Sequence, residues 1–280
     1  MAFGNMPIDG GFLSFTREEI ESAKISEVFQ ARYIRKIYGA AEYIRGLNRY
    51  CLWIADGDVD AASKEPTIKA RLTEVEKFRS ASKRPATREL ADKPYRFGWI
   101  AQTGNEVVTI LPRILSERRE YITVGQEPVG TLTTDQAYAL YDAPLWNMAI
   151  IASLLHIVWI TTVCGKLKTD LRYSNTLGWN TFPVPTLTEK NKADLIRCAE
   201  DILLAREAHF PATVADLYDP DAMPADLREA HERNDEVLER IYIGRRFRND
   251  TERLEKLFEL YTKMAASPGA AKKRKVEARA

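Results

Sequence analysis

Two clusters of basic and hydroxyl side chains are the residues most able to do chemistry in this chain, and the chemistry they suit is the binding of phosphates and bases. One cluster lies between two predicted strands, and the other follows directly on a long apolar segment. The members are Arg113, Ser116, Arg118 and Arg119 in the first cluster, and Lys166, Lys168, Arg172, Tyr173 and Ser174 in the second. Arginine can hydrogen-bond a guanine or a phosphate through two nitrogens, whereas lysine acts as a point charge on the nucleic-acid backbone. The clusters therefore predict a recognition surface rather than a catalytic centre.

The distribution of charge supports a bounded basic face, although the net charge of the chain is only +1. Residues 77–119 contain ten Lys or Arg against four Asp or Glu, whereas residues 186–265 contain thirteen against eighteen. Weaker candidates for phosphate contact in the basic segment are Lys83 and Arg84. Two alternatives remain open: the basic runs are ordinary solvated surface, or the run from Ser116 to Arg119 forms a salt bridge within the chain through Glu117 or Glu120.

No catalytic or cofactor-binding motif occurs in the sequence. It contains no G-x-G-x-x-G or G-x-x-x-x-G-K-[ST] run to hold a nucleotide, and no Asn-Pro-Pro-aromatic run of an amino-group methyltransferase. The three histidines lie on separate predicted elements, and the three cysteines are far apart, so neither a metal site nor a disulfide framework is predicted. We therefore expect no catalytic residue, cofactor or metal in this chain.

The sequence gives no sign of export or of a membrane. The N-terminus lacks a basic segment followed by an apolar core and a cleavage site. The apolar stretch 148–160 is interrupted by Ser153 and His156 and is shorter than the roughly 20 residues that span a bilayer. A cytoplasmic protein is expected, in which this stretch is a buried helix.

A mixed region of helices and strands must hold the two clusters. With 45% apolar residues, the chain is able to form the cores of about two domains. Thr16 and Glu19 stand at the spacing of a capping box, which predicts a helix start. Strands are predicted over 50–55, 97–102, 107–111 and 121–124, a hairpin turn at 103–106, and helices over 71–80 and from 146 to about 165.

Beyond residue 185 only helical patterns remain. Three amphipathic helices are predicted, beginning at about residues 188, 224 and 250. The residues expected to face inward are Leu195, Ala199, Ile202, Leu203, Leu227, Ala230, Val237, Leu238, Ile241, Leu254, Leu257, Phe258 and Tyr261. The fold class is therefore α+β: a mixed α/β domain followed by a small all-helical domain.

An ordered series of short motifs runs through the chain from about residue 3 to residue 264. The motifs are Phe3-Gly4-Asn5-Met6-Pro7, Tyr50-Cys51-Leu52-Trp53, Phe78-Arg79-Ser80-Ala81-Ser82-Lys83, Pro112-Arg113, Ser116-Glu117-Arg118-Arg119, His156 with Trp159, Gly165-Lys166-Leu167-Lys168, Arg172-Tyr173-Ser174, Asn180-Thr181-Phe182-Pro183-Val184-Pro185 and Leu217-Tyr218-Asp219-Pro220. In order and spacing they resemble the target-recognition and C-terminal helical domains of MmeI-like type IIL restriction-modification enzymes.

The resemblance implies that the chain works beside a methyltransferase. In such enzymes a nuclease, a helical connector and an S-adenosylmethionine-dependent adenine methyltransferase precede the two domains that this chain resembles. The segment matching Gly4 to Pro7 follows directly on the methyltransferase there, so Met1 is expected to mark a split gene, an internal start or a truncated reading. Methyl transfer and S-adenosylmethionine would belong to that methyltransferase domain or subunit, and any cleavage to a nuclease.

The resemblance also implies base-reading positions in the segment 152–156. Family members often carry a charged or hydroxyl side chain where this chain has Ala152 and Leu154, and an arginine where it has Lys166. As apolar side chains, Ala152 and Leu154 would contact a thymine methyl group or no base at all. The alternative is that both side chains pack in the helix core and have no role in recognition. His156 is predicted to contact DNA from the same segment.

We therefore predict a module that recognises a sequence in double-stranded DNA and presents an adenine to a methyltransferase. Its expected parts are a linker over 1–10, a target-recognition domain over 11–185, a C-terminal helical domain over 186–265 and a disordered basic tail over 266–280. The basic side chains are expected to converge on one concave face. The alternative is a truncated helical remnant or protein-interaction fragment without DNA function.

Overall fold

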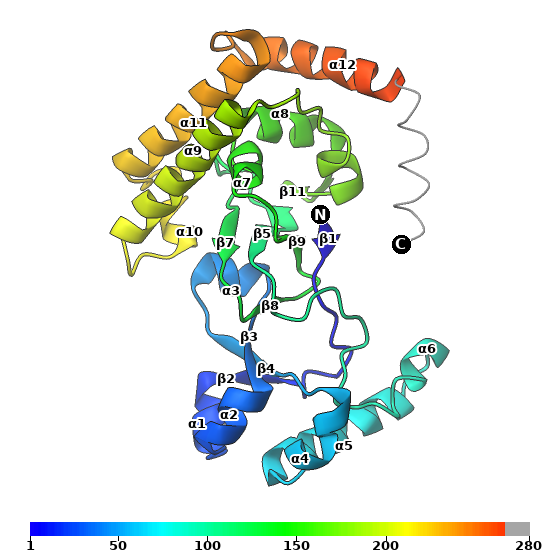
Figure 1. Ribbon diagram of the computed structural model, residues 1–280. Helices are drawn as coiled ribbons and strands as arrows, with labels where there is room; N and C mark the ends of the chain where they lie inside the picture. Colours follow the sequence, from blue (N-terminus) through cyan, green and yellow to red (C-terminus); the bar gives the residue numbers. More distant parts are fainter. Residues whose placement is uncertain (267–280) are drawn as a thin grey trace. The chain divides into compact units, whose positions relative to one another are not determined.

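A computed structural model describes residues 1–266 of the chain (Figure 1), so the predicted basic tail lies almost entirely outside the described residues. The described residues form two compact units. The first unit comprises Met1–Pro112 and Gln126–Ala143. The second comprises Arg113–Gly125 and residues 144–266, so it combines two segments of the predicted recognition domain, 113–125 and 144–185, with the helical C-terminal part. This division by compactness is distinct from the predicted domain boundary at residue 185, which stays a prediction.

One sheet of the first unit carries its main core. Its strand order is β2 (Ser14–Thr16), β4 (Arg49–Leu52), β3 (Ile34–Tyr38) and β8 (Thr131–Thr133), with β3 and β8 parallel and the other pairs antiparallel. The helices of this unit are α1 (Arg17–Ser22), α2 (Glu27–Tyr33), α3 (Ala40–Arg45), α4 (Val59–Ala62), α5 (Pro66–Ser80) and α6 (Pro85–Arg88). The predicted capping box is confirmed, because Thr16 Oγ1 accepts from Glu19 N at 3.2 Å and Glu19 Oε2 accepts from Thr16 N at 2.9 Å.

A second sheet has the order β1 (Ala2–Phe3), β9 (Ala137–Tyr141), β5 (Val108–Pro112) and β7 (Gly125–Glu127). The prediction of a strand over 97–102 is wrong, since this segment makes only an isolated bridge between Trp99 and Met6. It is held instead by the buried Asn5, whose Oδ1 accepts from Ala101 N and Gln102 N. A side chain therefore replaces the ladder of backbone bonds that a strand would need.

The predicted hairpin at 103–106 is also wrong. The Glu106 carboxylate folds back and accepts from the backbone nitrogens of Thr103 and Gly104, at 3.2 and 3.0 Å. A turn closed by a side chain satisfies these donors locally, so no second strand is required to pair with β5 at this point.

Arg79, part of the motif at residues 78–83, is a structural residue of the first unit. Its side chain is fully buried at the end of α5 and donates hydrogen bonds to five backbone carbonyls, those of Pro7, Ile8, Leu90, Lys93 and Arg96, at 2.7–2.9 Å. These carbonyls come from two segments that have no regular structure to satisfy them. One guanidinium thus ties the N-terminal segment to the loop after α6.

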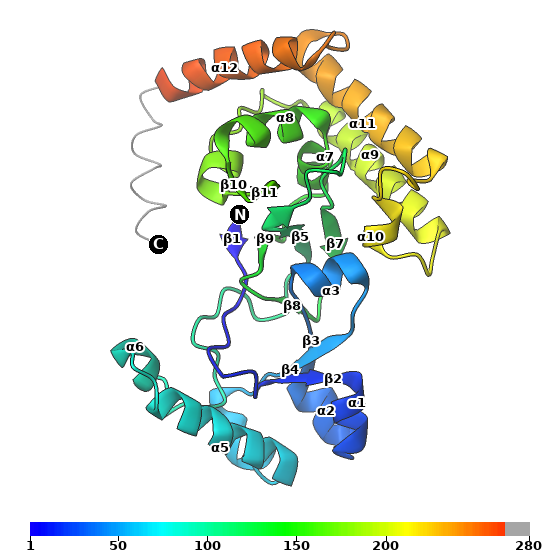
Figure 2. The ribbon, with the colours of Figure 1, turned by 180° about the vertical axis from the view of Figure 1, so that it is seen from behind.

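The second unit consists of a small sheet and a group of helices (Figures 1 and 2). The sheet has the order β10 (Gly165–Leu167), β11 (Asp170–Arg172) and β6 (Ile114–Leu115). The helices are α7 (Trp146–Ile151), α8 (Leu154–Val163), a π-helical turn (Asn175–Trp179), α9 (Glu189–Ala208), α10 (Val214–Leu217), α11 (Ala225–Ile243) and α12 (Asp250–Ala266). Both views show α9 and α11 side by side, with α12 running along α8.

The apolar helix predicted from residue 146 is in fact two helices. α7 ends at Ile151 and α8 begins at Leu154, because Ser153 has extended backbone angles. The Ser153 hydroxyl accepts from His156 N at 3.2 Å, which makes it the N-cap of α8. Among residues 1–266, no helix has the length and apolar character needed to cross a bilayer.

The three predicted C-terminal helices are confirmed as α9, α11 and α12. Thr188 caps α9 by accepting from Asn191 N at 3.1 Å, and Gly244 ends α11 in the left-handed conformation with φ +78°. Most of the predicted inward residues are buried or half-buried; Phe258 is exposed but contacts Trp159 on α8. Past residue 185 the described chain forms helices and loops, as the sequence predicted.

Candidate nucleic-acid interface

The small sheet of the second unit brings the two predicted clusters together. Strand β6 leads into the loop of the first cluster, and β10 and β11 form the hairpin of the second. In register, Leu115 lies opposite Leu171 and Ile114 opposite Arg172, and Tyr173 N donates to Arg113 O at 2.9 Å. Segments about fifty residues apart in sequence therefore form one supported surface.

The sheet does not point all its basic side chains the same way. Lys166 lies opposite Leu171, whereas Arg172 lies opposite Gly165. Because side chains alternate along a strand and paired residues share a face, Lys166 and Arg172 lie on opposite faces of the sheet. The expectation that all the cationic side chains converge on one face is therefore wrong for Arg172.

A pocket of about 280 Å³ lies on the Lys166 side of this sheet, entirely within the second unit. Apolar side chains of β6, β11 and α8 line it, including Leu115, Leu171 and Ile157. Its polar lining residues are Ser116, Glu117, Arg119, Thr123, Thr161 and Lys166. Two cations beside an apolar floor can accept an anion attached to an apolar body, as in a nucleotide.

The two arginines of the loop have different surroundings. Arg118 is exposed and forms an ion pair with the exposed Asp221 at 3.2 Å. Arg119 is half-buried, and this burial lowers the pKa of its guanidinium, while Asp219 and Asp170 favour its charged form. The loop thus has intramolecular partners, and Glu120, one of the two carboxylates considered for a salt bridge within the chain, pairs with Arg228.

Three of the predicted DNA-contacting side chains are buried within the second unit, namely Ala152, His156 and Tyr173. His156 Nε2 lies 2.9 Å from the Tyr173 hydroxyl, among the rings of Trp179 and Phe182. Burial lowers the pKa of His156 to about 3, so the ring is neutral at physiological pH. These side chains shape the protein around the surface, and their contact with DNA stays a prediction.

The remaining candidates lie at or near the surface. Lys168 stands in the turn of the β10–β11 hairpin with φ +57° and is exposed, as are Lys166 and Arg172 on the two strands. Leu154 and Arg113 are half-buried, as is Ser174, whose hydroxyl caps the π-helical turn by accepting from Leu177 N at 3.3 Å.

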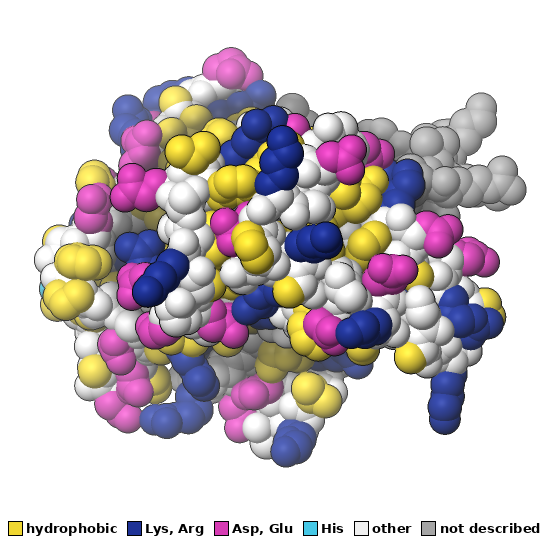
Figure 3. Space-filling model, turned by 90° about the horizontal axis from the view of Figure 1, so that it is seen from below, with side chains coloured by type: hydrophobic (Ala, Val, Ile, Leu, Met, Phe, Trp, Pro, Cys, Tyr) yellow, Lys and Arg dark blue, Asp and Glu magenta, His cyan; other side chains and the backbone are white. Residues whose placement is uncertain are grey.

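Lys83 and Arg84 belong to the first unit, exposed just before α6. On the face shown in Figure 3, Lys and Arg side chains are interspersed with Asp and Glu. Surface charge by itself therefore does not mark a binding site on that face, and the small sheet of the second unit is the better guide.

A row of buried polar residues on α11, consisting of His231, Asn234, Asp235 and Glu239, was not predicted from the sequence. Their spacing puts them on one face of the helix, and this spacing was the available signal. The described residues 1–266 hold no group of three or more His, Cys, Asp or Glu arranged for a metal ion.

Comparison with known proteins identifies the family. Residues 1–186 match the model of the MmeI target recognition domain, and residues 187–267 match the model of the MmeI C-terminal domain. DNA methyltransferase A of Bacillus subtilis (strain 168) is 37% identical over 262 residues, which cover 94% of this chain and 30% of that protein.

A solved structure of the type IIL restriction-modification enzyme MmeI in complex with DNA superposes on the chain with a TM-score of 0.88 and 31% sequence identity. The match covers 95% of this chain and 35% of that one, so this chain spans about a third of the length of these relatives. The motifs, the mixed fold and the matched models agree: the chain belongs to the MmeI family and comprises its target recognition domain followed by its C-terminal domain.

Proposed function

We propose that this chain recognises a sequence in double-stranded DNA on behalf of a DNA adenine methyltransferase. The observation that carries the proposal is the small sheet of the second unit, which holds the loop with Arg118 and Arg119 against the hairpin with Lys166 and Lys168. Rigid strands that deliver cations from two distant segments suit contact with a regularly spaced phosphate backbone.

The exposure of each basic side chain indicates which kind of DNA contact it would make. Lys168 and Arg118 are exposed and serve as phosphate contacts, since a surface ion pair such as Arg118–Asp221 is worth at most about 1 kcal/mol and exchanges readily for a phosphate. Arg119 is half-buried at the pocket and is held more rigidly. It is therefore the better candidate for reading a base edge.

Methyl transfer is assigned to a separate part of the enzyme, in the same polypeptide or in a partner subunit. That part would hold S-adenosylmethionine, extrude the target adenine and carry out catalysis, and a nuclease domain would supply any cleavage. The role of this chain is to fix which adenine is presented. A DNA-modifying enzyme of this kind works in the cytoplasm, where its substrate lies.

A salt titration tests the proposal. The chain, together with the methyltransferase domain or subunit, is titrated against a labelled mixed-sequence duplex, and fluorescence anisotropy is followed from low to physiological salt. Affinity is expected to fall linearly with the logarithm of salt concentration, with a slope of about −0.9 per phosphate contact. Binding that is undetectable at low salt, or that does not respond to salt, would count against the proposal and favour a remnant without DNA function.

Mapping of methylated bases in DNA exposed to the assembled enzyme identifies the recognised sequence. Methylation confined to one short motif is expected. Methylation scattered over adenines without a shared motif would show that the chain does not select the site.

A further inference from the structure

The row of buried polar residues on α11, here named the α11 polar row, is unusual for a helix interior. His231, Asn234, Asp235 and Glu239 are each at most 1% exposed. Polar and charged side chains are rarely this buried unless they are paired, because their removal from water costs several kcal/mol each. Their contacts therefore have to explain why these four positions of the buried face are not apolar, as Leu227, Ala230 and Leu238 on the same helix are.

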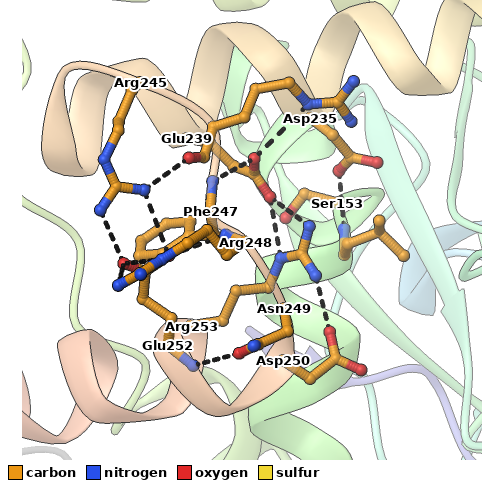
Figure 4. Close-up of polar contacts among 12 residues, drawn as sticks. Ser153, Asp235, Glu239, Arg245, Phe247, Arg248, Asn249, Asp250, Glu252 and Arg253 are labelled. Atoms are coloured by element: carbon orange, nitrogen blue, oxygen red, sulfur yellow. Dashed lines mark hydrogen bonds and ion pairs between the residues drawn. The ribbon is translucent and has the colours of Figure 1, made fainter.

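Asn234 and Asp235 hold the two sides of the break between α7 and α8. Asn234 Nδ2 donates to Ala149 O at 2.9 Å, near the end of α7. Asp235 Oδ1 accepts from Leu154 N at 2.7 Å, at the first residue of α8 (Figure 4). Leu154 N is one of the amides that a helix start leaves without an intrahelical partner, and a carboxylate there also favours the helix dipole.

The same row holds the segment that carries the basic loop. The ring of Tyr121 stacks on His231 with centroids 4.1 Å apart, and its hydroxyl faces the Asp235 carboxylate. Tyr121 follows directly on the loop of the first cluster and lines the pocket together with Arg119. One helix face thus contacts both the start of α8 and the base of the loop.

α8 in turn presents a face to the pocket. Ile157 and Thr161 line the pocket, and Leu154 lies one turn before Ile157 on the same side of the helix. A shift at the first residue of α8 therefore moves this face relative to Arg119 and Lys166. The position of Leu154 N decides the geometry of the candidate interface.

The far end of the row is anchored to α12. Glu239 accepts from Arg253 Nε at 2.8 Å and from Phe247 N at 3.0 Å, and Arg253 also pairs with Asp250 at 2.7 Å (Figure 4). These bonds fix the turn between α11 and α12. Rotation of α11 about its axis would break them, so the row is locked in one orientation.

We infer that Asn234 and Asp235 are positioning residues, which set the register of α8 against the basic loop and thereby determine sequence discrimination without touching DNA themselves. The inference rests on the proposed function. It assigns a specificity role to the C-terminal domain, through two side chains of α11. Directional hydrogen bonds fix a register that apolar packing would leave free to slide.

Amide hydrogen exchange tests the positioning directly and needs no DNA. Asp235→Leu removes the acceptor, Asp235→Asn keeps an acceptor oxygen at similar volume, and Glu236→Gln changes the neighbouring, more exposed carboxylate that pairs with Arg240. Exchange at Leu154 N is expected to be at least tenfold faster in Asp235→Leu and unchanged in Glu236→Gln, with Asp235→Asn close to the wild type. Equal protection of Leu154 in Asp235→Leu would overturn the inference.

Selection from a random duplex pool tests the consequence for specificity, using the chain with the methyltransferase domain or subunit. Asp235→Leu is expected to lower the preference for selected over mixed-sequence duplex by tenfold or more, while the salt dependence of binding is unchanged. Asp235→Asn is expected to restore the preference. An unchanged sequence preference in Asp235→Leu, or a loss of preference that Asp235→Asn does not restore, would overturn the inference. Wild-type protein that binds no duplex would instead overturn the proposed function. In that case the exchange measurement would still decide whether Asp235 fixes the start of α8.

Discussion

The hydroxyl of Tyr173 lies 2.9 Å from Nε2 of His156, with both side chains buried in the second unit. The contact ties α8 to the segment that follows β11, so it links the predicted base-reading helix to the basic hairpin. Both residues were predicted to touch DNA. In the structure both side chains are buried and support the elements that carry the exposed cations, and their contact with DNA stays a prediction.

Tyr173→Phe is expected to destabilise the protein by about 1 kcal/mol, because a buried His156 nitrogen loses its hydrogen-bond partner. Denaturant unfolding measures the change. Tyr261→Phe offers a control, since this tyrosine is only half-buried and contacts Trp159 through its ring. A loss of DNA affinity without any loss of stability would show that Tyr173 contacts DNA after all.

His156 is expected to remain neutral across the physiological range. Burial lowers its pKa to about 3, so protonation would begin only in strongly acidic solution. The ring resonances in an NMR titration should not change between pH 5 and pH 8. A midpoint near 6.5 would show that the ring is accessible to water.

Arg79→Gln is expected to lower the free energy of unfolding by about 3 kcal/mol or more. The buried guanidinium donates to five backbone carbonyls, and a shorter amide is unable to reach them all. Arg88→Gln is the matched control, because Arg88 is exposed and donates to the carbonyl of Ser82 at 2.9 Å. Equal effects of the two substitutions would contradict the structural role of Arg79.

The stability of the protein is expected to fall as pH rises from about 4 to about 7 through the titration of Asp235. Burial, with a contribution from Glu239, raises the pKa of Asp235 to about 7 against about 3.9 in the unfolded chain, while Leu154 N, Tyr121 and Arg253 oppose the shift. Between these two pKa values the folded state holds a proton on Asp235 that the unfolded chain has released. Loss of this proton as pH rises therefore lowers the free energy of unfolding, by an amount on the order of a few kcal/mol.

Asp235→Asn should remove this component of the pH dependence. Chemical unfolding at several pH values compares the variant with the wild type and with Glu236→Gln. Parallel pH profiles for Asp235→Asn and the wild type would show that the carboxyl titrates at its ordinary pKa.

The two arginines of the loop should respond differently to substitution. Charge reversal at Arg119 is expected to weaken binding by about 1 to 3 kcal/mol and to alter sequence preference, whereas reversal at Arg118 should weaken binding equally for all sequences. Asp221→Asn, which releases Arg118, should strengthen binding slightly. Lys190→Gln on α9 is a control, because it removes an exposed lysine far along the sequence from the small sheet. Unchanged affinity on reversal of both arginines would exclude the loop from the interface.

Local patterns in the sequence determined much of the secondary structure. The capping box at Thr16, the start of α9 at Thr188 and the three C-terminal helices follow from neighbouring residues and from the spacing of apolar side chains. The order of the short motifs indicated the family, since each motif is a run of a few neighbouring residues that is recognisable without the tertiary structure.

Tertiary structure decided the features that depend on partners distant in sequence. Asn5 replaced a predicted strand with side-chain bonds, and the register of β10 and β11 placed Lys166 and Arg172 on opposite faces. Asp235 became a helix cap for a residue about eighty positions away. The reason is physical: a helix start or an apolar face is fixed by neighbours along the chain, whereas the direction of a charged side chain and the partner of a buried one are fixed only when separate segments pack together.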